Sequence, residues 1–171
     1  MKRLEQSFFQ IPAPELAPLL LGKIICRRWG GGVLRARISE TEAYYGESDT
    51  ACHASRGRTQ RTDIMYAAGG HAYVYLCYGV HEMFNIVSGS EGFPEAVLIR
   101  GVEGYEGPGK LTRHLKINRK FNKVNLGISR ELWLEDDDAA TPSHTACKRV
   151  GIGYADEKDR ERLWRFVVSK R

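Results

Sequence analysis

The stretch HAYVYLCYGVHEMFNIV, residues 71–87, predicts a β-hairpin. Aromatic and β-branched residues fill both arms, and Gly79 marks a turn between them. The turn of a hairpin is normally polar because it faces water. Tyr78 stands at this turn, so the sequence places an aromatic side chain where folding alone does not call for one.

The segments around this hairpin predict an α+β fold. Strands linked by hairpins favour an antiparallel sheet with helices inserted between strands, and not a regular βαβ alternation. No repeat or long linker divides the chain, so we expect one domain over residues 1–171. Further strands are expected at residues 23–29, 33–44, 95–103, 132–136, 147–154 and 164–169, and helices at 12–22, 63–68 and 109–117.

Composition sets limits on the class of protein. The chain has 171 residues, of which 42% are apolar and 27% charged, values typical of a globular protein with a real core. The net charge of +5 leans toward a polyanionic partner without establishing one. The N-terminus has no apolar core of a signal peptide, and no run reaches the roughly 18 apolar residues of a membrane helix. The sequence therefore predicts no contact with a membrane.

The four cysteines are scattered and form no C-x-x-C pair. This spacing argues against a zinc ribbon or a disulfide scaffold. Cys52, His53 and Cys77 could be imagined as metal ligands, but small buried thiols beside an unrelated histidine are far commoner. We therefore expect no metal and a reducing, cytoplasmic location, associated with the nucleoid if the source is prokaryotic.

Glu40 and Glu42 form the first candidate for chemistry, in the segment ETEAY. Residues i and i+2 of a strand share a face and lie about 6.5 to 7 Å apart. Two carboxylates at that separation could serve an inverting sugar hydrolase. Two glutamates on a solvated strand face are also common, so the spacing alone leaves both interpretations open.

Arg56, Arg58 and Arg61 form a basic segment in RGRTQRT. Arginines among small hydroxyl residues in a loop suit phosphate oxygens, although a solvated basic loop has the same appearance.

A second candidate for phosphate binding is GYEGPGKL, residues 104–111, which nearly matches the P-loop pattern. Leu111 stands where that pattern needs a hydroxyl, and no βαβ unit surrounds it, so an ATPase is excluded. Lys110 lies at an expected helix start, where free backbone N–H groups can still help to bind a phosphate.

Several longer motifs occur in an order that resembles the alkyladenine (methylpurine) DNA glycosylase family. The resemblance covers about residues 16–168. The motifs are ETEAYYGESDTACHASRG, YVYLCYGVHEMFNI, AVLIRGVE, GPGKL and RVGIG.

The resemblance implies three catalytic positions. Glu42 matches the glutamate that activates the attacking water. Arg100 and the backbone carbonyl of Val150 match groups that hold this water. Glu40 receives no role.

The resemblance also implies a base pocket and a wedge. Tyr44 and His53 match one wall of the pocket, and Tyr75 the opposite wall. Asn85 matches the residue that obstructs the exocyclic amino group of guanine. Tyr78 matches a side chain that enters the minor groove where the flipped nucleotide was, which would explain an aromatic residue at the hairpin tip.

The function implied is excision of alkylated or deaminated purines from damaged double-stranded DNA. The class includes methyladenine, methylguanine, hypoxanthine and ethenoadenine. The family acts through water, so we expect a monofunctional enzyme without lyase activity or cofactor, and a monomer with a curved sheet and a protruding hairpin. Val80 and His81 depart from the larger pair of vertebrate members, so groove contacts and lesion preference can differ.

Two other functions remain open on the sequence. One is a nucleoside or sugar hydrolase that uses Glu40 and Glu42 on a free small molecule. It leaves Tyr78 and the basic segment unexplained. The other is a silent nucleic-acid binding module with Tyr78 as an architectural wedge.

Overall fold

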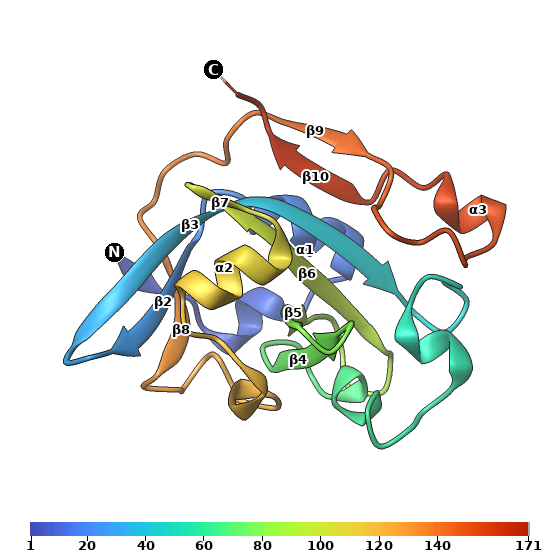
Figure 1. Cartoon of the computed structure of the whole chain (residues 1–171), viewed down its shortest axis with the longest axis horizontal. Helices are drawn as coiled ribbons and strands as arrows, with labels where there is room; N and C mark the ends of the chain where they lie inside the picture. The colour runs from blue at the N-terminus through green and yellow to red at the C-terminus, as the bar shows by residue number, and fades with distance from the viewer. Residues whose placement is uncertain (171) are drawn as a thin grey trace.

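Antiparallel pairing organises the chain in the computed structural model, which describes residues 1–170 (Figure 1). Ten strands form one open sheet with the order β1-β8-β2-β3-β6-β5-β4, to which β7, β9 and β10 add at the side. The strands are β1 (Lys2–Arg3), β2 (Ile24–Trp29), β3 (Gly32–Tyr45), β4 (Ala72–Cys77), β5 (His81–Val87), β6 (Glu95–Val102), β7 (Tyr105–Glu106), β8 (Leu132–Asp136), β9 (His144–Cys147) and β10 (Arg165–Val168).

The helices are short and lie between the strands. Both longer ones, α1 and α2, begin beside a proline, whose fixed φ suits the first helical turn. Helix α1 packs on β3 and β6, and α2 packs on β5 and β6. The helices are α1 (Ala13–Leu19), α2 (Pro108–His114) and α3 (Glu157–Arg160), with the 3₁₀ turns η1 (Gln6–Phe9), η2 (His53–Arg56), η3 (Asp63–Tyr66) and η4 (Arg119–Phe121).

Strand β3 is the longest element and crosses the molecule (Figure 1). Its first half pairs with β2, and its second half lies between β6 and β10. In this register Glu42 stands opposite Leu98 on one side and Arg165 on the other. Glu42 is therefore held in the interior of the sheet and not on an edge.

One apolar core joins the sheet to both longer helices. Leu16 in α1 and Leu111 in α2 are fully buried in it, as are Leu20 and Leu115, which directly follow these helices. Burial of a leucine side chain contributes roughly 1.5–3 kcal/mol, so these contacts fix the helices on the strands that carry the site.

The structure confirms the α+β class, the antiparallel sheet and the hairpin of β4 and β5. The expected strand at residues 147–154 is wrong. The strand in this region is β9, which pairs with the outer side of β10 and ends at Cys147. Arg149 then turns into the interior, and Gly151 has a φ of +73°, which ends an extended path.

None of the helices within residues 1–170 has the length and apolar character needed to cross a membrane.

Glu95, at the start of β6, connects the sheet to α1. Its side chain is 2% exposed and accepts hydrogen bonds from the Ala13 backbone N–H at 2.9 Å and from the Ser88 hydroxyl at 3.3 Å. Gly89 lies so close that a β-carbon there would overlap the carboxylate. Burial raises the pKa of Glu95 to about 7, against the effect of the two donors.

We predict that Glu95 makes stability depend on pH. Its folded-state pKa lies above the unfolded value, so its contribution is complete below about pH 4.5 and is lost as the pH rises through about 7. Glu95→Gln keeps an acceptor for Ala13 and removes the charge. The variant should exceed wild type at pH 8 by at most about 3 kcal/mol in the free energy of unfolding.

Denaturant titrations at several pH values measure this difference. Glu91→Gln, in an exposed loop, is the control and should follow wild type. Parallel curves for Glu95→Gln and wild type would contradict the assignment.

Candidate active site

Glu42 is the centre of the candidate site. Its side chain is fully buried in β3. The Tyr44 hydroxyl donates to Oε2 at 2.7 Å, and the Val150 backbone N–H donates to Oε1 at 2.7 Å. Arg100 Nε lies 3.6 Å from Oε1. The carboxylate therefore faces three donors, which favour its charged form.

Burial and these donors act on Glu42 in opposite directions. Burial raises the pKa of Glu42 above the ordinary value of a glutamate, while Arg100, the Val150 N–H and the Tyr44 hydroxyl lower it. A buried carboxylate with a raised pKa is a stronger base than one in water. Glu42 is therefore a candidate for a general base.

Glu40 has a different environment from Glu42. It lies at an irregular register of β3, is 16% exposed, and accepts from Arg100 at 3.1 Å and Arg165 at 3.2 Å. Arg100 thus contacts both carboxylates, as expected of residues on one strand face. Two arginines neutralise Glu40, whereas Glu42 is the carboxylate with buried donors.

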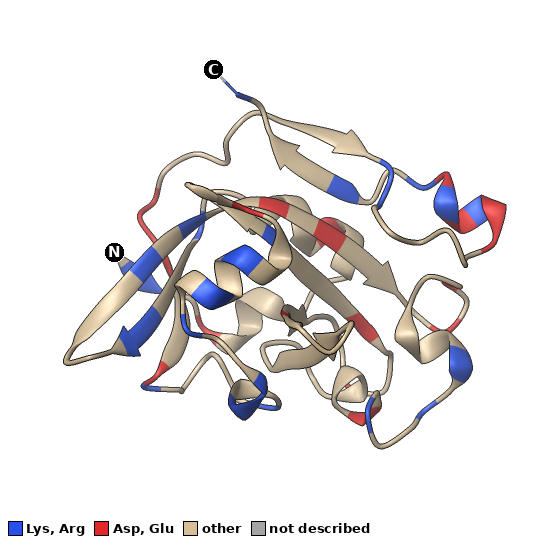
Figure 2. Ribbon diagram, viewed as in Figure 1, with Lys and Arg blue, Asp and Glu red and all other residues tan. Residues whose placement is uncertain are grey.

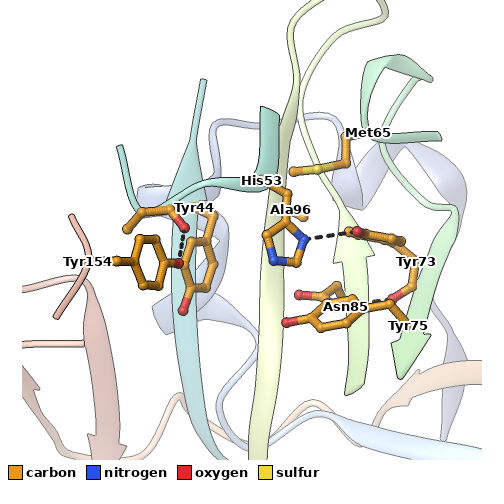
Figure 3. Close-up of a pocket in the computed structure, with 9 residues that line it drawn as sticks. Tyr44, His53, Met65, Tyr73, Tyr75, Asn85, Ala96 and Tyr154 are labelled. Atoms are coloured by element: carbon orange, nitrogen blue, oxygen red, sulfur yellow. Dashed lines mark hydrogen bonds between the residues drawn. The ribbon is translucent and has the colours of Figure 1, made fainter. Parts of the chain in front are cut away.

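An aromatic pocket is lined by Tyr44, the side chain that donates to Glu42 (Figure 3). A cleft of about 450 Å³ is bordered by Tyr78, Arg100 and Val150. An inner hollow of about 40 Å³ shares part of its lining with this cleft. Both hollows share Tyr44, His53, Tyr75 and Tyr154 in their lining.

The walls of this pocket differ in one respect from the sequence-based expectation. Figure 3 shows Tyr44 and Tyr154 on one side and Tyr73 and Tyr75 on the other, with His53 between them. The His53 ring contacts Tyr75 edge to face, with centroids 4.7 Å apart, and its Nδ1 lies 2.9 Å from the Tyr73 hydroxyl. His53 thus contacts the rings on the Tyr75 side, whereas the sequence analysis placed it beside Tyr44. Which rings a base would contact stays a prediction.

His53 is uncharged at neutral pH. Burial lowers its pKa to about 4, and the nearby Arg61 and Arg56 act in the same direction. The imidazole therefore adds no positive charge to the pocket.

Asn85 lies in the pocket lining and is buried. Its Nδ2 donates to the Tyr73 carbonyl at 3.1 Å, which fixes the amide on β5. The sequence prediction did not include Tyr73 or Tyr154. Tyr73 stands two residues before Tyr75 and so on the same strand face, a signal that could have identified it. Tyr154 reaches the pocket from a loop, where no such periodicity applies.

Tyr78 projects from the tip of the β4–β5 hairpin. Its side chain is 92% exposed, which confirms the predicted aromatic tip. The Val80 N–H donates to the Cys77 carbonyl at 3.1 Å, and Tyr78 and Gly79 have φ values of +51° and +67°, as a type I′ turn requires. Glycine adopts this conformation freely, but in a tyrosine it is uncommon and strained. The tip therefore exposes an aromatic ring to water and holds a tyrosine in a strained backbone conformation. Such costs are often found at functional positions.

The hairpin is braced from α2. The Thr112 hydroxyl donates to the Glu82 carbonyl of β5 at 2.9 Å, and Arg119 lies 3.3 Å from the Glu82 carboxylate. These contacts hold the strand that carries the exposed tip.

The predicted basic residues lie in two places, on the η2–η3 loop and on α2 (Figure 2). Arg58 pairs with Asp63 at 2.7 Å, and Arg61 lies 4.9 Å from the centre of the Tyr75 ring. Arg56 and Arg61 line a hollow of about 520 Å³ that also borders His53. Lys110 is exposed on α2, apart from the other three.

Comparisons with known proteins show the family of this chain. The family model described as Methylpurine-DNA glycosylase (MPG) matches residues 7–106 and 104–171. The chain belongs to the methylpurine-DNA glycosylase family.

Curated relatives span nearly the same length. Proteins of Borrelia garinii subsp. bavariensis, Methanocella arvoryzae and Rickettsia felis are each named "Putative 3-methyladenine DNA glycosylase". They are 43%, 42% and 40% identical to this chain, over 97%, 100% and 97% of it and 96%, 98% and 93% of their own lengths. The chain is therefore similar to them throughout, and the family implies a DNA repair enzyme that hydrolyses N-glycosyl bonds.

The site of this glycosylase consists of donors, carboxylates and aromatic rings. Within residues 1–170 no three His, Cys, Asp or Glu side chains lie close enough together to hold a metal ion.

We predict that Tyr44 sets the pH at which base excision is lost on the acid side, which is the acid limb of the pH–rate profile. An ionised Glu42 is active above its pKa, and activity is lost as the pH falls through that value. Tyr44→Phe removes one donor to the carboxylate, so the pKa of Glu42 should rise further and the acid limb should move up by about one pH unit.

Single-turnover excision across pH tests this shift. Tyr154→Phe is the matched control, because its hydroxyl donates to the Ala51 carbonyl at 2.7 Å and not to Glu42. An unshifted limb in Tyr44→Phe would show that the hydroxyl does not support the charge of Glu42.

Proposed function

We propose that this enzyme flips a damaged purine out of duplex DNA and hydrolyses its glycosidic bond with a water activated by Glu42. The observation that carries the proposal is a fully buried carboxylate whose donors, Tyr44 and Val150, line the same cleft as an exposed tyrosine. The product is an abasic site, and the strand is left intact.

Flipping explains the tip of the hairpin. Extrusion of a nucleotide costs a few kcal/mol, less when the base is damaged and weakly paired. The Tyr78 ring can fill the gap in the stack and hold the extruded state. Because Tyr78 and Tyr75 lie on the same hairpin and line the same cleft, insertion of the tip and entry of the base are coupled.

The pocket receives the flipped base between Tyr44 on one side and His53 with Tyr75 on the other. Stacking on aromatic rings contributes roughly 1–3 kcal/mol per base. A positively charged alkylated purine gains further from the electron-rich rings, and the neutral His53 does not repel it. Asn85 obstructs the exocyclic amino group of undamaged guanine. The substrate class that we propose is methyladenine, methylguanine, hypoxanthine and ethenoadenine. Methylguanine keeps the amino group of guanine, so its acceptance depends on the gain from its positive charge.

Hydrolysis needs water as its only co-reactant. Arg100 and the Val150 carbonyl hold the water, and Glu42 takes its proton as the oxygen bonds to C1′. The electrons of the C1′–N bond leave with the base. The sugar becomes positively charged in the transition state, and the nearby carboxylate stabilises that charge.

The basic side chains complete the interface. Arg56 and Arg61 flank the base pocket, and Arg58 and Lys110 lie on exposed surface, so each can reach a phosphate oxygen. Arg58 must first exchange its partner Asp63 for a phosphate.

We predict that Glu42 performs the chemistry and Glu40 does not. Glu42→Gln keeps the shape of the side chain but cannot accept the proton. It should bind damaged duplex while single-turnover excision falls at least about 100-fold. Glu40→Gln is the matched control on the same strand face and should retain activity.

Release of labelled base from a duplex that carries one hypoxanthine measures both variants. Equal rates for Glu42→Gln and wild type would refute the assignment. Hydrolysis of free nucleosides without action on the duplex would instead favour a nucleoside hydrolase.

We also predict that Tyr78 acts on flipping and not on stability. Tyr78→Ala removes an exposed side chain, so the free energy of unfolding should change by no more than ~0.5 kcal/mol. Excision from duplex should fall by the equivalent of one stacking contact, roughly 1–3 kcal/mol. A lesion in a single strand needs no plug and should be affected less.

Tyr78→Phe is the control that keeps the ring, and it should behave like wild type in duplex excision. Thermal unfolding and excision from both DNA forms separate the outcomes. A destabilised Tyr78→Ala with equal losses on both forms would show a packing role.

A further inference from the structure

Arg149 lies beside the active site and has no part in the proposed chemistry. Its side chain is 0% exposed, and that of its partner Asp49 is 1% exposed. The two guanidinium nitrogens donate to the two carboxylate oxygens at 2.7 and 2.9 Å. The ion pair joins the loop after β9 to the loop after β3, across 100 residues of sequence.

The remaining hydrogen bonds of Arg149 go to two backbone carbonyls, one of them next to Glu42. One nitrogen also donates to the Ala43 carbonyl at 3.0 Å, and Ala43 stands between Glu42 and Tyr44. The other donates to the Asp159 carbonyl at 3.1 Å. Arg149 thus fixes strand β3 at the point where it carries both residues.

Arg149 also contacts or adjoins both hydrogen-bond donors of Glu42. Its guanidinium carbon lies 4.9 Å from the centre of the Tyr44 ring, the hydroxyl of which donates to Oε2. Arg149 also directly precedes Val150 in the chain, and the Val150 backbone N–H donates to Oε1 of Glu42. One buried side chain therefore controls the position of two donors that come from different elements.

A role in stability alone does not account for this arrangement. A buried ion pair gains little over apolar packing, because both charges lose their hydration. Nε of Arg149 is also buried without a hydrogen-bond partner, which adds a further cost. The planar guanidinium donates hydrogen bonds in fixed directions, like a fork, and an apolar side chain could not do this.

We propose that Arg149 is a positioning residue, which holds the two hydrogen-bond donors of Glu42 in place through its ion pair with Asp49. The role rests on the proposed function of Glu42 as the base that activates water. Without the fork, the Val150 N–H and the Tyr44 hydroxyl move away from the carboxylate.

The charged and titratable groups that face Glu42 come from every element around it. Arg100 reaches it from β6, Tyr44 from β3, and Arg149 from the loop after β9. Arg165 is its neighbour on β10, but the guanidinium of Arg165 pairs with Glu40. A change at Arg149 must therefore be separated from a general change of charge.

Arg149→Lys makes this separation, because it keeps the positive charge and removes the fork. Single-turnover excision at neutral pH should fall about 10- to 100-fold, as expected when donors are misplaced. The acid limb of the pH profile should move up by about one unit, as when one charged hydrogen bond is weakened. A purely structural residue would lower the melting temperature without moving this limb.

Asp49→Asn is the second variant and keeps Arg149 itself. It should move the limb in the same direction, and the double variant should move it no further than the larger single shift. If Arg149→Lys does not fold, Asp49→Asn decides the question alone. Arg162→Lys is the matched control, because Arg162 pairs with Asp159 at 3.1 Å and stacks on Trp164 without touching a donor of Glu42.

A titration of the Glu42 carboxyl carbon by NMR in the free protein gives a readout that needs no activity. The midpoint should be higher in both variants than in wild type. If wild type excises no base, the proposed function fails, and this titration still decides the role of Arg149. Unchanged midpoints in both variants, or an equal shift in Arg162→Lys, would overturn the proposal.

Discussion

The burial of one carboxylate among three donors is the constraint on which the site depends. Glu42 has no contact with solvent, yet it accepts from Tyr44 and Val150 and lies beside Arg100. An ionised carboxylate in such a place is stable only if its donors are held in fixed positions. The sheet, the loop after β9 and the Arg149–Asp49 pair each supply part of this fixation.

The fold brings the hydrogen-bond donors of Glu42 and the exposed Tyr78 to one cleft. Strand β3 places Glu42 between β6 and β10, while the adjoining β4–β5 hairpin carries the pocket rings and ends at Tyr78. In the proposed function the interior of the sheet supplies the group that reacts. The exposed tip, braced by α2 through Thr112, meets the DNA in the proposed complex. In this proposal a flipped base enters the pocket without a rearrangement of the sheet.

Periodic and turn signals in the sequence predicted the hairpin, the long strand of Glu42 and both longer helices. These features depend on local residue patterns, such as the alternating rings around Tyr75 and the glycine after Tyr78. The path after β9 could not be predicted in this way, because Arg149 is drawn inward by Asp49, a residue 100 positions away. The position of His53 against Tyr75 has the same origin, since its 3₁₀ turn is placed by contacts between distant segments.

The roles of Glu42, Tyr78 and Asn85 came from the resemblance to a family, and no local pattern would have assigned them. Spacing alone left Glu40 and Glu42 equivalent. Their difference lies in burial and partners. Two arginines hold Glu40, while Glu42 is fully buried and accepts from a hydroxyl and a peptide N–H.

Analysis of the products formed on a duplex with a single methyladenine tests the central claim most directly. The account predicts that wild type releases the free base and leaves a strand that breaks only on later treatment with alkali. An intact glycosidic bond after prolonged incubation, or a strand cut by the enzyme itself through a covalent intermediate trapped by borohydride, would contradict hydrolysis by a water that Glu42 activates.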